Sequence, residues 1–270
     1  MENRKSTVWL KIFVVVTFIA MVTVNALSAL LPINGITPGQ VSDSYPNLFA
    51  PAGITFSIWG LIYLLLAGHA LYQAGLFQGK NAQADSGLLG KVGVLFSLSS
   101  LVNTAWVFSW HYRIIPLSML LMALLIFCLI AIMHAIHRGK LSLREKIFIG
   151  LPFSVYFGWI TVATIANATV LLVSLGWGGF GLPQSLWTVI ILVVGAVIGA
   201  VTTIRFQNIA YGLVLVWAYA GILIKHTSAP GFANQYTDVI VTVCVCIAVF
   251  IASILSVLIT RKKKQASNQG

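Results

Sequence analysis

Eight long apolar runs, separated by short segments that hold most of the charged, proline and glycine residues, make up most of this chain. The runs cover approximately residues 8–31, 52–76, 92–110, 114–136, 147–173, 186–204, 206–224 and 239–259. A helix needs about 20 apolar residues in succession to cross the hydrocarbon core of a bilayer. The pattern therefore predicts an all-α fold, a polytopic membrane helix bundle with about eight transmembrane helices.

The composition agrees with a membrane protein and excludes several classes of soluble protein. Of the 270 residues, 59% are hydrophobic and 8% are charged, and the mean hydropathy is +0.96. A soluble domain has about a quarter of its residues charged. Cytosolic enzymes, secreted disulfide scaffolds and nucleic-acid-binding proteins are therefore excluded. Cys128, Cys244 and Cys246 lie within apolar runs, where cysteine is typically a packing residue.

The positions of the basic residues predict the orientation in the membrane. With the amino terminus inside, 14 of the 16 Lys and Arg residues lie on the cytoplasmic side, and only Arg113 and Lys225 lie outside. Both termini are therefore predicted to be cytoplasmic, and a bacterial plasma membrane suits this arrangement best. The first run resembles a signal peptide at residues 26–28, but its length favours an uncleaved helix. The basic tail at 261–264 is interpreted as a stop-transfer anchor that anionic headgroups attract.

Groups that carry proton transport or hydrolysis in membranes are scarce in the apolar runs. All five acidic residues lie in predicted loops or at helix ends. Because intramembrane proton relays and hydrolases usually need a buried ionisable group, an enzyme is not the favoured interpretation, although it stays open. His134 and His137 share a helix face but are expected at the interface rather than on a metal ion. His69, deep in the second run, is expected to form a structural hydrogen bond to a neighbouring helix.

Aromatic and amide side chains recur three or four residues apart in the second, third and fifth runs, which places them on one face of each helix. The predicted ligand-binding residues are Trp59, Tyr63, Asn103, Trp106, Tyr156, Trp159, Ala163 and Asn167. An interfacial aromatic belt explains Trp9, Trp110 and Trp177, but it does not explain Trp159, which lies inside a span. Clustered aromatic rings with a few polar groups are typical of a site for a flat, hydrophobic ligand.

At these residues the chain resembles the TspO/MBR family, the tryptophan-rich sensory proteins related to the mitochondrial translocator protein. The fifth run, YFGWITVATIAN, is similar to the family signature Y-x-x-W-x-x-x-A-T-x-x-N, and LVNTAW in the third run is similar to L-N-x-x-W. The second run keeps the spacing of Pro51, Trp59 and Tyr63. The chain departs from the family at Ile54, where a tryptophan is usual, and at Val155, where a proline is usual.

The resemblance covers residues 1 to about 175, the length of the five-helix fold of that family. It implies a TspO/MBR-like five-helix bundle at 1–175, followed at 176–270 by a three-helix transmembrane extension with a basic cytoplasmic tail. The segment SLGWGGFGLP at 174–183 is the best candidate for the boundary. Gly195 and Gly199 form a G-x-x-x-G pair, which indicates close helix packing.

The resemblance also implies that a hydrophobic or tetrapyrrole-like ligand binds among the helices of a sensor or carrier. Porphyrin or haem would then be a ligand, and no resident cofactor is expected. The expected partners are membrane lipids and a lipophilic small molecule such as a tetrapyrrole, with no nucleic acid and with a homodimer left open. Two alternatives remain. One is a transporter or permease subunit, which His69 and the extra helices favour, and the other is a tetrapyrrole-degrading enzyme that uses Trp59, Trp106 and Trp159.

Overall fold

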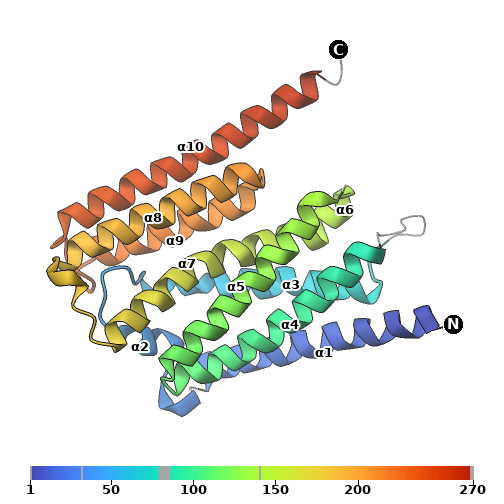
Figure 1. The fold of residues 1–270 in the computed structure, drawn as a ribbon, viewed down its shortest axis with the longest axis horizontal. Coiled ribbons are helices and arrows are strands. Elements are labelled where there is room, and N and C mark those ends of the chain that lie inside the picture. The colour runs from blue at the N-terminus through green and yellow to red at the C-terminus, as the bar shows by residue number, and fades with distance from the viewer. Residues whose placement is uncertain (1, 32, 79–85, 140, 268–270) are drawn as a thin grey trace. The chain divides into compact units, whose positions relative to one another are not determined.

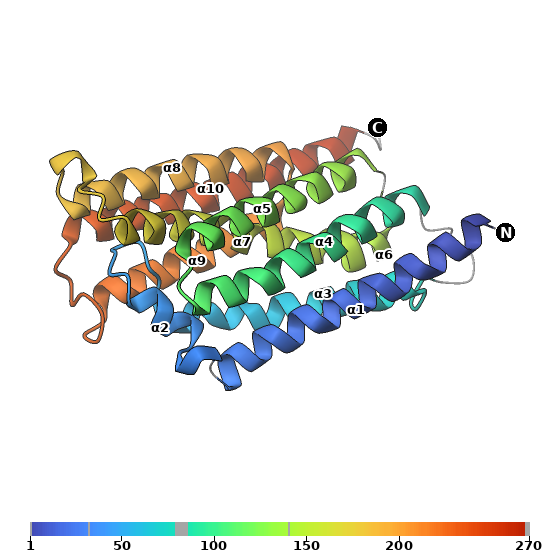
Figure 2. The same ribbon diagram turned by 60° about the horizontal axis from the view of Figure 1, so that its bottom comes forward.

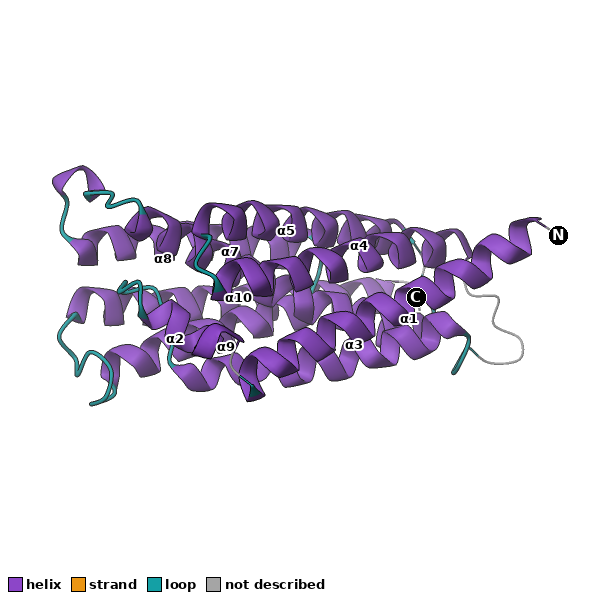
Figure 3. Cartoon of the chain, turned by 90° about the horizontal axis from the view of Figure 1, so that it is seen from below, coloured by secondary structure: helices purple, strands orange, loops and turns teal. Residues whose placement is uncertain are grey.

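The computed structural model of the chain describes residues 2–31, 33–78, 86–139 and 141–267, and these residues form only helices and loops (Figure 3). Eight of the described helical segments are long and apolar enough to cross a membrane. They are Val8–Leu30, Gly53–Ala74, Gly87–His111, Ile115–Arg138, Leu143–Ser174, Gln184–Arg205, Ile209–Thr227 and Thr237–Lys264. The predicted all-α membrane bundle is thus confirmed. Lys80 and Lys140, which contributed to the predicted orientation, lie outside the described residues.

The chain packs as two compact units. Unit 1 comprises Met1–Ser44 and Ile58–Ile160, and unit 2 comprises Tyr45–Ser57 and Thr161–Gly270. The units are defined by packing, and their boundaries differ from the division near residue 175 that the family resemblance implies. That division stays a prediction.

Unit 1 is built around one long helix, α4 (Ser86–His111), which lies alongside α1 (Glu2–Leu30) and α5 (Ile115–Arg138) (Figures 1 and 2). Helix α1 also packs against α3 (Ile58–Ala74). The shorter elements of this unit are η1 (Ile33–Gly35), α2 (Pro38–Asp43), α6 (Leu143–Glu145) and η3 (Lys146–Gly150), and η3 continues directly into α7 (Leu151–Ser174). Figure 1 shows α7 as one continuous helix, whose first part belongs to unit 1 and whose second part belongs to unit 2.

A capping box starts the helical segment that leads into α7. The Ser142 hydroxyl accepts a hydrogen bond from the Glu145 backbone N–H at 3.3 Å, and the Glu145 carboxylate accepts one from the Ser142 backbone N–H at 2.8 Å. Glu145 is buried at the first turn of the helix. Its carboxylate accepts from a backbone N–H that has no partner within the helix, and its negative charge interacts favourably with the positive end of the helix dipole. This acid therefore has a capping role, in agreement with its predicted position at a helix end.

Unit 2 contains three membrane-spanning helices, α8 (Gln184–Arg205), α9 (Ile209–Thr227) and α10 (Thr237–Ser267), with α10 packed against both of the others (Figure 1). The short elements η2 (Gly53–Ser57) and η4 (Gly179–Gly181) complete it. A Cβ atom added at Gly195 would lie 2.6 Å from the Tyr219 hydroxyl oxygen, and one at Gly199 would lie 2.7 Å from the Phe250 ring. The G-x-x-x-G pair therefore permits close packing, as its spacing predicts.

The segment between α1 and α3 divides between the two units. In unit 1, the Trp110 indole N–H donates to the Pro38 carbonyl oxygen at 3.1 Å. The second half, Tyr45–Ser57, packs on α9 in unit 2. There the Ala52 backbone N–H donates to the Gly221 carbonyl oxygen at 2.9 Å, and the Trp217 indole N–H donates to the Thr55 carbonyl oxygen at 3.0 Å. This segment is therefore a structural part of unit 2, although it precedes α9 by more than 150 residues.

Candidate functional site

Two helices of unit 1 bring four of the predicted aromatic residues into contact. Trp59 and Tyr63 lie one turn apart on α3, and their rings stack with centroids 5.3 Å apart. Trp59 also meets Tyr156 and Trp159 of α7 edge to face, with a centroid distance of 6.1 Å in each pair. Aromatic pairs are favourable at centroid separations of about 4.5–7 Å. Trp59 is thus the centre of a cluster of four aromatic rings, two from α3 and two from α7.

Helix α4 adds Asn103 to this region, and Trp106 follows Asn103 by about one helical turn. The Asn103 side chain is fully buried, and its Oδ1 accepts a hydrogen bond at 2.8 Å from Nδ2 of Asn25 on α1. Asn103 also lies beside the Tyr156 hydroxyl without forming a hydrogen bond of ordinary geometry. Trp106 stacks on Trp110 with centroids 5.6 Å apart. We call the six residues of unit 1 the Trp59 cluster: Trp59, Tyr63, Asn103, Trp106, Tyr156 and Trp159.

Asn25 is a polar neighbour of the candidate site that sequence reasoning did not identify. Its Nδ2 donates one hydrogen to the Met21 carbonyl oxygen at 2.9 Å and the other to Asn103. Because a carbonyl oxygen can only accept, the contact with Met21 establishes which atom of the Asn25 amide is the nitrogen, and hence that Asn103 presents its oxygen. The available signal was an asparagine in the middle of an apolar run, since such a residue needs a polar partner.

Four polar atoms of the Trp59 cluster are buried with no hydrogen-bond partner among the described residues. They are Tyr63 Oη, Asn103 Nδ2, Trp106 Nε1 and Tyr156 Oη. The amide and indole nitrogens can only donate, whereas the tyrosine hydroxyls can donate or accept. Burying such a group without a partner costs about 1–3 kcal/mol. The cluster therefore has hydrogen-bonding capacity, mostly of the donor kind, that the surrounding helices do not use.

Two of the predicted site residues belong to the second part of α7. Ala163 and Asn167 follow Trp159 along the helix by about 6 and 12 Å, as the helical rise requires. They lie in the part that packs within unit 2, and Asn167 is buried there. Six of the eight predicted residues are therefore in unit 1, and the continuous helix is what links the other two to them.

His69 makes the structural hydrogen bond expected for it. Its Nδ1 lies 2.9 Å from the Phe148 carbonyl oxygen in η3. Since that oxygen can only accept, Nδ1 carries the proton and Nε2 presents a lone pair. The imidazole also packs edge to face against Phe96 and Phe153, with centroids 5.3 and 4.7 Å away. His69 thus joins three segments of unit 1.

A second group of unused polar atoms, which we call the His69 region, belongs to His69 and Gln73 on α3 and to Ser97 on α4. His69 Nε2 has no hydrogen-bond partner among the described residues, and neither have Gln73 Oε1 and Ser97 Oγ. The Gln73 Nε2 atom donates to the Leu89 carbonyl oxygen at 3.0 Å, so the amide oxygen is the free end. Sequence reasoning missed Gln73 and Ser97. In the part of the chain that the structure describes, no three His, Cys, Asp or Glu side chains form a group that could hold a metal ion.

Comparison with known proteins identifies the family. A family model described as TSPO-like protein matches residues 11–257. The match reaches into α10, so it includes the three helices that the sequence resemblance left outside. No curated protein and no solved structure matches the chain. Because the family model matches most of its length, this chain belongs to the TSPO-like protein family.

Proposed function

We propose that this integral membrane protein binds a flat, hydrophobic ligand carrying oxygen acceptors, such as a carboxylated porphyrin, at the Trp59 cluster, and that it acts as a sensor or carrier of this ligand. The observation that carries the proposal is a group of packed aromatic rings beside four polar atoms that have no hydrogen-bond partner among the described residues: Tyr63 Oη, Asn103 Nδ2, Trp106 Nε1 and Tyr156 Oη. Membership in the TSPO-like family supports a lipophilic ligand.

Two kinds of contact would supply the affinity. Each aromatic face offers a planar ligand about 0.5–1.5 kcal/mol beyond simple burial. A hydrogen bond from Asn103 Nδ2 or Trp106 Nε1 to a carboxylate contributes about 1.5–3 kcal/mol, because the acceptor is charged. Three or four such contacts, added to the apolar burial of the ring, are sufficient for a dissociation constant of about 1 μM, which corresponds to about −8.2 kcal/mol. The donors favour a ligand with acceptor groups over a pure hydrocarbon such as a carotene.

A titration with two porphyrins tests the proposal. Protoporphyrin IX carries two carboxylates, whereas octaethylporphyrin has the same ring with only ethyl substituents. We expect Trp106→Phe, which keeps an aromatic ring but removes the N–H donor, to weaken binding of protoporphyrin IX about tenfold, or about 1.4 kcal/mol, and to leave binding of octaethylporphyrin nearly unchanged. Trp159→Leu removes a ring and should weaken both. Binding is followed by porphyrin absorbance, so that loss of a tryptophan fluorophore does not affect the readout.

Trp9→Phe is the matched control, because Trp9 is 71% exposed and lies outside the cluster. If Trp106→Phe weakens porphyrin binding no more than Trp9→Phe does, Trp106 makes no specific contact with the porphyrin and the proposed site is wrong. Transfer of bound porphyrin across proteoliposomes would distinguish a carrier from a sensor. We further propose a plasma-membrane location with both termini cytoplasmic, which the basic residues at the ends of the spans support.

A further inference from the structure

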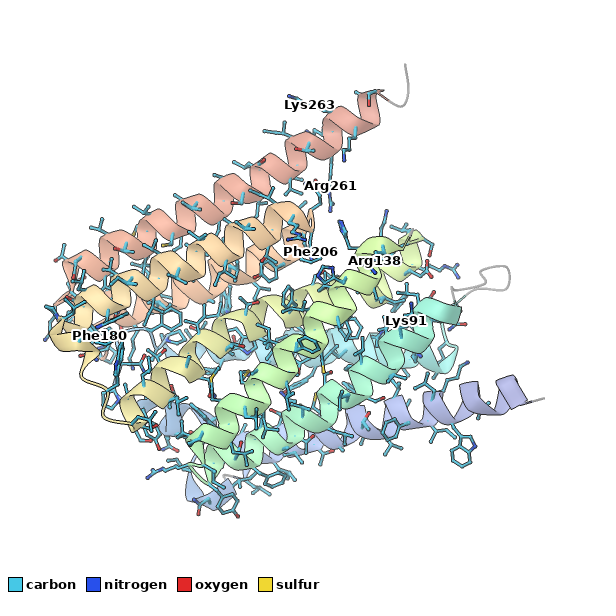
Figure 4. All side chains as sticks on the ribbon, in the orientation of Figure 1. Lys91, Arg138, Phe180, Phe206, Arg261 and Lys263 are labelled. Atoms are coloured by element: carbon cyan, nitrogen blue, oxygen red, sulfur yellow. The ribbon has the colours of Figure 1, made fainter. Side chains whose placement is uncertain are left out.

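An open groove lies between the first turns of α4 and the last turns of α5, away from the Trp59 cluster. Its volume is about 830 Å³, and both of its walls belong to unit 1. Figure 4 shows Lys91 on α4 and Arg138 on α5 at the same end of this helix pair. Both helices are membrane spans, and the groove occupies their ends. It therefore lies where a span meets the polar headgroups of the bilayer.

The rim of the groove is cationic. Lys91 contributes an ammonium group from one wall, and Arg138 contributes a guanidinium group from the other. His134 lies one turn before Arg138 on the same face of α5 and also lines the groove. None of the described residues on the lining is acidic, and neither Lys91 nor Arg138 forms an ion pair or hydrogen bond with the described parts of the chain. Two positive charges therefore face the groove without a counter-charge from the described residues.

The deeper wall is apolar and the entrance is wide. Val94 and Leu95 lie about one turn further into the span than Lys91, and Ala131 lies about two turns further into the span than Arg138. Gly90 lies on the lining, and a Cβ atom added there would meet no heavy atom within 4 Å. The groove thus combines a cationic rim at headgroup depth with an apolar wall at acyl-chain depth. An inorganic anion would use only the first of these features.

We propose that this groove is a specific site for one anionic phospholipid, such as phosphatidylglycerol. The lipid phosphate pairs with Lys91 and Arg138 across the mouth of the groove, and one acyl chain lies along Val94, Leu95 and Ala131. Basic pockets between transmembrane helices are suited to anionic headgroups, because two fixed cations hold one phosphate better than scattered surface charges do. The basic tail at 261–264 carries four positive charges, but those residues do not line this groove, so its attraction to lipid is diffuse.

The test uses the purified full-length chain and counts the lipids that it retains, by native mass spectrometry, from mixtures of phosphatidylglycerol and phosphatidylcholine. Wild type should retain one phosphatidylglycerol in preference. Lys91→Gln/Arg138→Gln should lower that affinity at least tenfold. Gly90→Leu should do the same without a change in charge, because the new side chain fills the groove. Lys262→Gln/Lys263→Gln removes the same two charges elsewhere and should retain the lipid.

Three results would overturn the proposal. Equal loss of lipid from the Lys262/Lys263 control would mean diffuse attraction by net charge. Undiminished binding to Gly90→Leu would mean that the lipid lies elsewhere. A thermal stabilisation by inorganic phosphate as large as that by phosphatidylglycerol would mean a soluble anion site. Circular dichroism and melting of each variant without lipid show whether it is folded, so a loss of binding is not confused with a loss of structure.

Discussion

The hydrogen bond between Asn25 on α1 and Asn103 on α4 allows the structural role of Asn103 to be separated from its proposed ligand-binding role. The Oδ1 atom of Asn103 accepts the hydrogen bond from α1, whereas its Nδ2 atom has no hydrogen-bond partner among the residues that the structure describes. Replacing Asn25 with Leu removes the interhelical bond but leaves Nδ2 of Asn103 in place. Replacing Asn103 with Leu removes both functions. The two substitutions should therefore have different effects on stability and on porphyrin binding.

The magnitude of the interhelical bond follows from its setting. Side-chain hydrogen bonds between membrane helices contribute about 0.6 kcal/mol on average and up to about 1.7 kcal/mol. The 2.8 Å distance and the complete burial of Asn103 favour a value of about 1 kcal/mol. A single variant does not isolate the free energy of this hydrogen bond. Asn103→Leu also removes the amide Nδ2 atom, whose burial without a partner costs about 1–3 kcal/mol. The coupling energy of a double-mutant cycle with Asn25→Leu does isolate it.

The assay is reversible unfolding of the ligand-free protein in mixed micelles, for wild type, both single variants and the double variant. We expect a coupling of about 1 kcal/mol between the two sites. Asn25→Leu should leave the protoporphyrin affinity within about threefold of wild type, whereas Asn103→Leu should lower it about tenfold. A coupling indistinguishable from zero would refute the structural role of this bond. Equal losses of affinity in the two single variants would refute the division of roles within Asn103.

Three further predictions concern unit 2 and the membrane topology. Gly195→Ala should destabilise the protein by about 1–3 kcal/mol through overpacking against Tyr219, whereas Gly90→Ala, which meets no atom, should be neutral or stabilising in the same unfolding assay. Trp217→Phe should increase hydrogen exchange in residues 45–57, because it removes the bond to the Thr55 carbonyl, and no change in that segment would contradict its docking on α9. Single cysteines at Ser44 and Ala233, both exposed, should be labelled from outside the cell, and protection of either would contradict the proposed orientation.

The spans could be predicted from the sequence because the bilayer imposes one strong requirement on each of them. A segment that crosses hydrocarbon must satisfy its backbone within a helix and must present apolar side chains over about 20 residues, and both conditions are local. The predicted ends of the helices were less accurate than their number. Helix α4 begins at Ser86 rather than near 92, and α10 continues to Ser267 rather than ending near 259. Both helices extend beyond their apolar runs through charged residues such as Lys91 and Arg261. Hydropathy therefore does not mark where these helices begin or end.

The pairing of helices was not accessible from one sequence. The spacing of Tyr156 and Trp159 indicates a shared face of α7, and this face does meet Trp59. Which helix lies opposite is decided by contacts between residues far apart in the chain, on which periodicity carries no information. The docking of Thr55 on α9 and the bond from Asn25 to Asn103 were missed for this reason. Polar atoms left unpaired by packing are likewise visible only once the helices are assembled.

Those unpaired atoms lead to a last prediction, about the link between stability and ligand. Each unpaired buried atom costs about 1–3 kcal/mol, so those of the Trp59 cluster and of the His69 region together are comparable with a typical total stability of about 5–15 kcal/mol. Removing one such atom without changing the shape should therefore stabilise the ligand-free protein, and we expect Tyr63→Phe and Ser97→Ala each to raise its free energy of unfolding by about 1 kcal/mol. The two should then differ when porphyrin is added: Tyr63→Phe should reduce the stabilisation that the ligand produces, and Ser97→Ala, outside the Trp59 cluster, should not. If both variants are destabilised without ligand, these atoms are already satisfied within the protein, and the unused donors on which the proposed function rests do not exist.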